Sequence, residues 1–120
     1  MKPHIGLEAF VENGPFAPNR IAKTLRTTLD EVAHTVGPGR DAVIRQDRIA
    51  SPKTQKRLRE MVEILNRVEP RLGSALIACG WYRSEPLAGF GGLTAMQLVR
   101  EGHAAAVLEY IDAVDAGIHA

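Results

Sequence analysis

The strongest constraint on the fold is a run of apolar residues in the middle of the chain that recurs every three or four positions. Its members fall on one stripe of an α-helix: Leu58, Met61, Val62, Leu65 and Val68. Ser51-Pro52 stands before the run, and serine as the N-cap followed by proline in the first turn is typical of a helix start. The sequence therefore predicts a long amphipathic helix that begins at Pro52 and buries this stripe.

Shorter helix signals precede this run. Residues 1–18 carry several prolines and glycines without a sustained period, which is typical of an arm. After a short amphipathic helix, Thr28 and Glu31 form a capping-box pair that starts the next helix. The Gly-Pro-Gly sequence at 37–39 ends that helix, because glycine supplies positive φ and proline prevents continuation. We expect a further short helix over residues 40–46.

The C-terminal part also has a helical pattern. Pro70 is expected to start a helix that closes at Gly80-Trp81. Four residues are expected on its inner face: Leu72, Ala75, Leu76 and Cys79. Residues 84–93 have the composition of a loop, and Thr94 with Gln97 forms a second capping box. Two helices then complete the chain, and a glycine ends each of them.

These patterns together predict an all-α protein. No segment alternates with period two for long enough to form a strand, and we count about seven helices arranged as a bundle. The 120 residues suffice for one domain. The longest clean apolar runs are too short for a membrane span, and the single cysteine, Cys79, fits a reducing compartment. We therefore expect a cytoplasmic protein.

The residues that carry chemistry in enzymes do not form a recognisable group here. The four histidines are far apart in the sequence: His4, His34, His103 and His119. No H-x-x-x-H pair and no G-x-S-x-G elbow occurs, so the sequence predicts neither a metal site nor a serine nucleophile. Cys79 falls on an apolar stripe, where a buried core cysteine is expected. We predict that the chain is not an enzyme and needs no cofactor.

The net charge of +1 conceals an uneven distribution of charge along the chain. Residues 19–71 hold twelve basic and seven acidic side chains, whereas residues 72–120 hold two basic and five acidic ones. A basic middle and an acidic end suggest two surfaces with different partners. Solvated helix faces without a partner would give the same distribution.

The basic part contains a helix-turn-helix signal. This motif needs a small residue where its helices cross, a turn residue that tolerates positive φ and an apolar anchor on the second helix. Ala33, Gly37 and Val43 stand at the corresponding spacings. Pro38 and Gln46 depart from the pattern, because aliphatic residues usually occupy those positions. A helical hairpin that only packs is therefore the alternative to DNA binding.

The second helix of such a motif would enter the major groove of DNA. Arginine can bond to guanine there, and aspartate can accept from a cytosine amine. Other basic residues would neutralise phosphates and make binding salt-dependent. The predicted DNA-binding residues are Arg40, Asp41, Ile44 and Arg45 for base edges, and Arg48, Lys53 and Lys56 for phosphates.

The last forty residues carry a more specific pattern of fixed spacings. Its parts are Trp81, Ser84 and Pro86, then Gly91-Gly92, Thr94, Leu98-Val99 and Gly102, and finally Val107, Ile111 and Gly117. This pattern resembles the toxin-binding domain of the Xre/MbcA/ParS antitoxin family. The helical region before it is similar to the Xre-like helix-turn-helix half of that family. Ala95 stands where the family often has proline.

The resemblance implies a partner and a mechanism. Family members are paired with RES-domain toxins, which consume NAD or transfer its ADP-ribose. The resemblance implies that the antitoxin dimerises through its C-terminal domain and occludes the toxin's active site with its C-terminal end. An acidic end fits a cleft that binds dinucleotide phosphates, because such a cleft should be positive. The residues assigned to toxin contact are Asp112, Asp115, Gly117, Ile118, His119 and Ala120.

We therefore divide the chain into an N-terminal arm (1–18), a helix-turn-helix-like region (19–69) and a toxin-binding domain (70–120). The predicted function is that of an antitoxin of a type II system that also binds its own promoter. The expected partners are a RES-type toxin, promoter DNA and a second copy of the chain. The alternative is a stand-alone DNA-binding regulator that uses its C-terminal domain only to dimerise.

Overall fold

The structure is a computed structural model of the chain, and it describes residues 16–36 and 46–115. Within these two ranges the regular elements are α-helices, and Pro86 and Thr94 form an isolated β-bridge. The all-α prediction is confirmed for this part of the chain. The number of helices stays a prediction, because residues 37–45 lie outside the described ranges. None of the described helices is long and apolar enough to cross a membrane.

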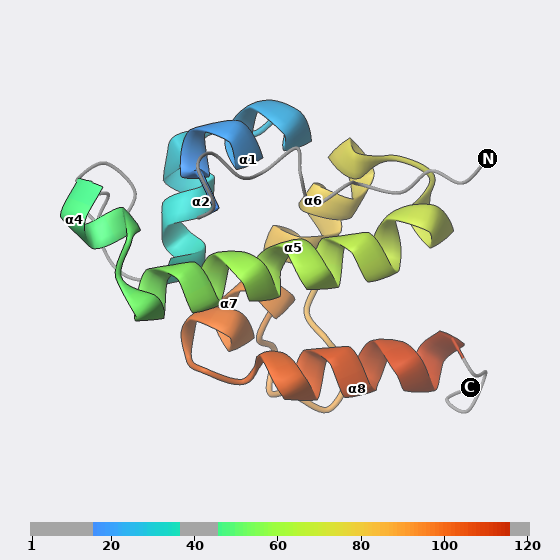
Figure 1. Ribbon diagram of the computed structural model, residues 1–120. Helices are drawn as coiled ribbons and strands as arrows, with labels where there is room; N and C mark the ends of the chain where they lie inside the picture. Colours follow the sequence, from blue (N-terminus) through green and yellow to red (C-terminus); the bar gives the residue numbers. More distant parts are fainter. Residues whose placement is uncertain (1–15, 37–45, 116–120) are drawn as a thin grey trace.

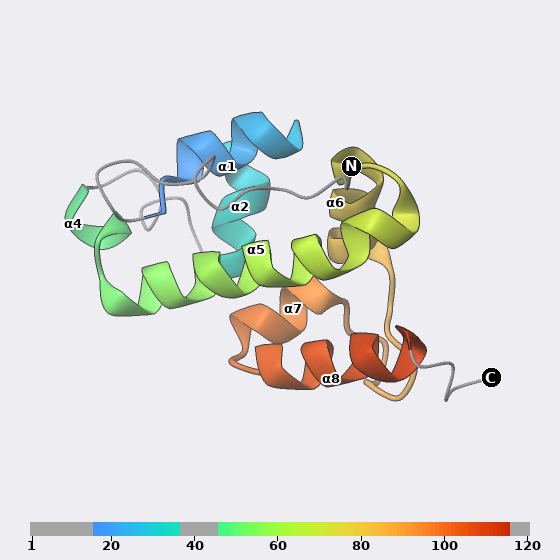
Figure 2. The same cartoon turned by 45° about the vertical axis from the view of Figure 1, so that its right-hand side comes forward.

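The long helix α5 organises the bundle. The helices in chain order are α1 (Pro18–Leu25), α2 (Leu29–Val36), α4 (Gln46–Ile49), α5 (Pro52–Leu72), α6 (Ala75–Ser84), α7 (Ala95–Arg100) and α8 (Ala104–Asp115). Helix α5 has 21 residues and crosses the middle of the molecule, with α1 and α2 on one side and α7 and α8 on the other (Figures 1 and 2). Helix α6 packs against α5, α7 and α1.

One hydrophobic core joins these helices. The predicted stripe of α5 is confirmed, since all five of its residues are buried. Ile21 and Leu25 of α1, Val32 of α2 and Ile111 of α8 belong to the same cluster of buried side chains. Burial of such aliphatic side chains stabilises the fold by roughly 1.5–3 kcal/mol each. The N-terminal and C-terminal halves therefore share a core.

The predicted helix starts are largely confirmed. The Ser51 hydroxyl accepts a hydrogen bond from the backbone N–H of Thr54 at 3.2 Å, as an N-cap should. The Thr28 hydroxyl accepts from the backbone N–H of Glu31 at 3.1 Å. The capping box of α7 is complete. The Thr94 hydroxyl accepts from the backbone N–H of Gln97 at 3.2 Å, and the side-chain amide oxygen of Gln97 accepts from the backbone N–H of Thr94 at 2.9 Å.

The prediction that Pro70 starts a helix is wrong. Helix α5 continues through Pro70 to Leu72 and ends at Gly73, whose φ is +96°. Only two residues of α5 follow Pro70, so the hydrogen bond that proline removes falls in the last turn, where helix ends fray anyway. The next helix begins later, because the Ser74 hydroxyl accepts from the backbone N–H of Ile77 at 3.1 Å and caps α6.

This later start changes which residues of α6 are buried. The inner face holds Ala78, Cys79 and Tyr82, so the prediction of a buried Cys79 is confirmed. Leu76 was expected on the same face, and that prediction is wrong, since it is 54% exposed. Helix α6 also runs past Gly80-Trp81 to Ser84, because the buried Tyr82 anchors its last turn.

Candidate functional site

The C-terminal end of α5 forms a pocket with the neighbouring helices, which we call the α5–α8 pocket. Its volume is about 160 Å³. Seven residues line it: Val68, Arg71 and Leu72 of α5, Trp81 of α6, and Tyr110, Ile111 and Val114 of α8. Helices α5 and α8 run side by side along this end of the bundle (Figures 1 and 2). The spacings 68, 71 and 72 on α5, and 110, 111 and 114 on α8, are those of single helix faces.

Most of this lining is apolar and fixed in place. Val68 and Ile111 are buried, and Leu72, Trp81 and Tyr110 are partly buried against the core. The Tyr110 ring meets the Phe90 ring edge to face, with centroids 6.1 Å apart and an angle of 81° between the planes. Aromatic pairs favour this geometry, so the Phe90 loop holds one wall of the pocket in position.

Two ion pairs border the pocket between α5 and α8. Arg67 pairs with Asp112, and Arg71 pairs with Asp115. The arginines are four residues apart and the aspartates three, so both pairs lie on facing sides of the two helices. The four side chains are between 40% and 64% exposed, so each pair contributes only about 0.2–1 kcal/mol. The rim is thus charged but locally neutral.

The two predicted toxin-contact carboxylates therefore lie at one site, but each already has an arginine partner. Sequence reasoning missed these partners, because they come from a helix more than forty residues earlier in the chain. The other predicted toxin-contact residues, Gly117, Ile118, His119 and Ala120, lie outside the described residues. Sequence reasoning also missed the pocket, since an apolar stripe predicts burial and not incomplete packing.

Of the predicted DNA-binding residues, too, some lie within the described part of the chain and others lie outside it. Arg40, Asp41, Ile44 and Arg45 lie outside the described residues, as do the turn glycine and the apolar anchor of the proposed motif. Arg48, Lys53 and Lys56 are exposed on α4 and the first turns of α5. The N-terminal end of a helix carries partial positive charge, which adds to that of the side chains. Lys53 and Arg71 are about 27 Å apart along α5, so the basic end and the pocket are separate surfaces.

The described residues provide no site for a metal ion or a reactive thiolate. No group of three His, Cys, Asp or Glu side chains within 16–36 and 46–115 is placed to hold a metal. Burial raises the pKa of the Cys79 thiol, which disfavours the thiolate form that acts as a nucleophile. The side chains at the pocket offer apolar contact, aromatic faces and paired charges.

A comparison with protein families gave a match for the part of the chain that contains this pocket. Residues 67–117 match the family model of the antitoxin Xre/MbcA/ParS C-terminal toxin-binding domain. The resemblance seen in the sequence is confirmed over this range. All seven residues that line the α5–α8 pocket and both arginine–aspartate pairs lie within it. Neither the comparison with curated proteins nor that with solved structures gave a match.

The match bears on function in one direct way. A toxin-binding domain of an antitoxin implies a toxin as the partner, and it supports an antitoxin role for the protein. The family description is that of a binding domain, which favours a non-enzymatic regulator. The matched range begins inside α5, so this helix belongs both to the toxin-binding domain and to the region before it.

Proposed function

We propose that this protein is the antitoxin of a toxin–antitoxin pair and that it binds its toxin through the end of the bundle where α5, α6 and α8 meet. The observation that carries the proposal is the family match over residues 67–117, which contains the whole α5–α8 pocket and its charged rim. The protein acts by binding and is not itself an enzyme.

The toxin that fits the resemblance best is a RES-domain protein that consumes NAD or transfers its ADP-ribose. In this proposal the segment that follows α8 occludes the toxin's active site, with contacts from Gly117, Ile118, His119 and Ala120. Asp112 and Asp115 supply negative charge toward a cleft built for phosphates. Their present pairs with arginines are exposed and weak, so an exchange of partner costs little. Toxin and antitoxin would meet in the cytoplasm.

Co-expression tests the proposal directly. The tagged chain is expressed with the protein encoded beside it, and co-purification and cellular NAD are measured. We expect a stable complex and normal NAD, whereas the neighbour alone should deplete NAD. Independent elution of the two proteins, or NAD loss in spite of the complex, would overturn the proposal.

The charged rim and the terminal segment are tested with variants of the chain. Asp112→Asn with Asp115→Asn, and removal of residues 118–120, should each weaken suppression of the toxin. Glu101→Gln with Glu109→Gln is the matched control, because these acids are exposed and neither pairs with Arg67 or Arg71. Equal loss in both double variants would point to general charge and not to the rim.

Promoter binding is the second part of the proposal. The exposed Arg48 of α4, with Lys53 and Lys56 in the first turns of α5, supports it, because exposed cations favour contact with phosphates. In this proposal Arg40, Asp41, Ile44 and Arg45 read the bases. Replacing Arg40 and Arg45 with Ala should abolish promoter binding and leave toxin suppression intact. A stand-alone regulator, the alternative, would bind DNA without any toxin partner.

The third part is a homodimer. Leu76 and Ile77 are adjacent on the first turn of α6 and are 54% and 56% exposed, which is unusual for large apolar side chains at one place. Leu76 is also one of the residues that line a shallow hollow, the others being Thr24, Arg26, Ser74 and Ala75. A two-fold interface places the same patch against itself, so a projecting side chain beside a hollow suits it. Light scattering should give a dimer for the wild type and a monomer for Leu76→Asp with Ile77→Asp.

A further inference from the structure

We infer that the α5–α8 pocket receives one apolar side chain of the toxin and is the anchor point of the complex. The inference rests on the proposed function and adds what the toxin inserts and where. It concerns a contact in which the antitoxin is the receptor, made by residues other than those of the segment that follows α8.

The size and lining of the pocket define the side chain that fits. Its volume is about 160 Å³. An apolar cavity of about 150 Å³ accommodates benzene, so the pocket has room for one leucine, isoleucine, methionine or phenylalanine side chain. Six of its seven lining residues are aliphatic or aromatic, and the seventh is Arg71; the six are Val68, Leu72, Ile111, Val114, Trp81 and Tyr110. A lysine or arginine side chain would lose hydration there and would also face the positive charge of Arg71.

The pocket is already formed in the chain alone. Val68 and Ile111 are buried in the shared core, and Phe90 holds the Tyr110 ring from the other side. The Arg71–Asp115 pair joins α5 to α8 at the border of the pocket. A pocket that needs no rearrangement loses less entropy on binding, and apolar anchors in such pockets dominate the affinity of many interfaces.

Arg71 on the rim also indicates which groups of the toxin should flank the inserted side chain. A guanidinium has five N–H donors, and the pair with Asp115 leaves some of those of Arg71 available. They can donate to backbone carbonyls of the toxin that flank the inserted side chain. The expected ligand is therefore an apolar side chain on an exposed loop or turn of the toxin, and not a free small molecule.

The toxin is the favoured occupant because every residue that lines the pocket falls within the matched toxin-binding domain. The hollow beside Leu76 differs in this respect, since Thr24 and Arg26 lie outside the matched range. The pocket thus lies within the part of the chain that the family description names as toxin-binding. A second copy of the chain, or the segment that follows α8, would be a different occupant, and the experiment below separates them.

The chain offers a direct reporter of the pocket, because Trp81 is its one tryptophan. The full chain is labelled with ¹⁵N, and the indole N–H signal of Trp81 is followed while the unlabelled neighbouring gene product is added. We expect the signal to shift or to be replaced on binding. Val114→Phe, which fills the pocket, should weaken binding at least tenfold while the helical circular dichroism stays that of the wild type.

The matched control is Ala105→Phe. Ala105 is exposed, and nine residues along a helix turn the side chain to the opposite face of α8 from Val114. This variant should bind within twofold of the wild type. If Val114→Phe fails to fold, the Trp81 signal of the wild-type chain alone decides the question.

The outcomes separate the inference from the proposed function. Wild-type binding with an unmoved Trp81 signal, or with unchanged affinity of Val114→Phe, overturns the inference and leaves the antitoxin function standing. No binding by the wild type overturns both. A Trp81 signal that moves with the concentration of the chain alone assigns the pocket to a second copy. One that moves on removal of residues 118–120 assigns it to that segment. Either result also overturns the inference.

Discussion

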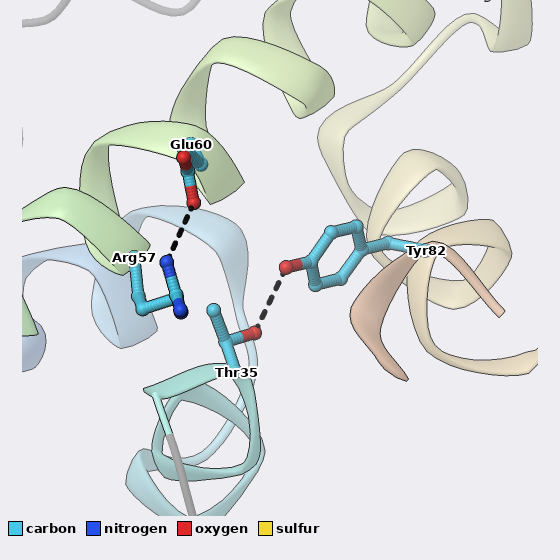
Figure 3. A network of polar contacts seen from close by, with 4 residues as sticks. All are labelled: Thr35, Arg57, Glu60 and Tyr82. Carbon is cyan, nitrogen blue, oxygen red and sulfur yellow. Dashed lines mark hydrogen bonds and ion pairs between the residues drawn. The ribbon is translucent and has the colours of Figure 1, made fainter. Parts of the chain in front are cut away.

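Tyr82 shows how single residues tie the two halves of the chain together. Its hydroxyl lies 2.9 Å from the Thr35 hydroxyl, and both side chains are buried (Figure 3). Thr35 belongs to α2 and Tyr82 to α6, so this hydrogen bond joins the region before the matched domain to the domain itself. Beside it lies an ion pair within α5, in which Nη1 of Arg57 and Oε1 of Glu60 are 3.4 Å apart (Figure 3). Loss of one hydroxyl would leave the other buried without its partner.

Tyr82→Phe should therefore lower the free energy of unfolding by about 1–3 kcal/mol, the cost of an unpaired buried hydroxyl. Urea denaturation followed by circular dichroism measures this loss. Thr35→Val combined with Tyr82→Phe should cost less than the sum of the two single changes, since the double variant leaves no unpaired group. Strictly additive losses would show that the two hydroxyls do not interact.

The same burial gives the stability a pH dependence. Burial raises the pKa of Tyr82 and that of Cys79 above their ordinary values. In the unfolded chain the thiol ionises at about pH 8.5 and the phenol at about pH 10, so the unfolded state loses these protons first as the pH rises. Stability should be constant with respect to these groups below that range and should fall as the pH rises through it. Unfolding measured at increasing pH should show a shallower fall above pH ~10 in Tyr82→Phe.

At the scale of elements, helix α7 depends on its capping box. Thr94 is buried, and it exchanges hydrogen bonds with Gln97. The backbone of Thr94 also forms the β-bridge to Pro86. Thr94→Ala should lower the free energy of unfolding by about 1 kcal/mol, because it leaves an N-terminal N–H of α7 unpaired. Thr94→Ser keeps the hydroxyl and should lose much less. Equal losses for Ala and Ser in thermal unfolding would indicate that packing of the methyl group matters more than the cap.

Helix boundaries also show how far sequence reasoning reaches. The starts of α2, α5 and α7 were predictable, because a cap is a local interaction between residues three apart. The border between α5 and α6 was not predictable from the sequence. A proline can start a new helix, or it can be tolerated in the last turn of the helix before it, as Pro70 is here. The Ser74 cap was the available local signal for that border, since a serine here precedes an apolar helical segment.

The candidate site was predictable only in part. Asp112 and Asp115 were correctly placed on a terminal helix, and the motif that contains Trp81 pointed to the matched domain. The arginine partners and the pocket depend on α5 and α8 lying side by side, which no local pattern encodes. Contacts of this kind follow from the packing of the whole bundle.

At the scale of the whole molecule, the matched domain is not structurally separate. Helix α7 packs against α2 and α5 as well as α8, and Tyr82 needs Thr35 for its hydrogen bond. A fragment of residues 67–120 would expose the faces that α2 and most of α5 now cover. We expect circular dichroism to show this fragment as largely unfolded. The full chain should unfold in one transition, with Trp81 fluorescence and circular dichroism coinciding. A folded fragment would contradict the shared core.

The most direct test of the central claim is hydrogen–deuterium exchange of the full chain with and without its toxin. The account predicts slower exchange in α8 and in the C-terminal turns of α5, around the α5–α8 pocket, and no change in α1. Slower exchange confined to α1, α4 and the first turns of α5, with α8 unaffected, would contradict toxin binding at this end of the bundle.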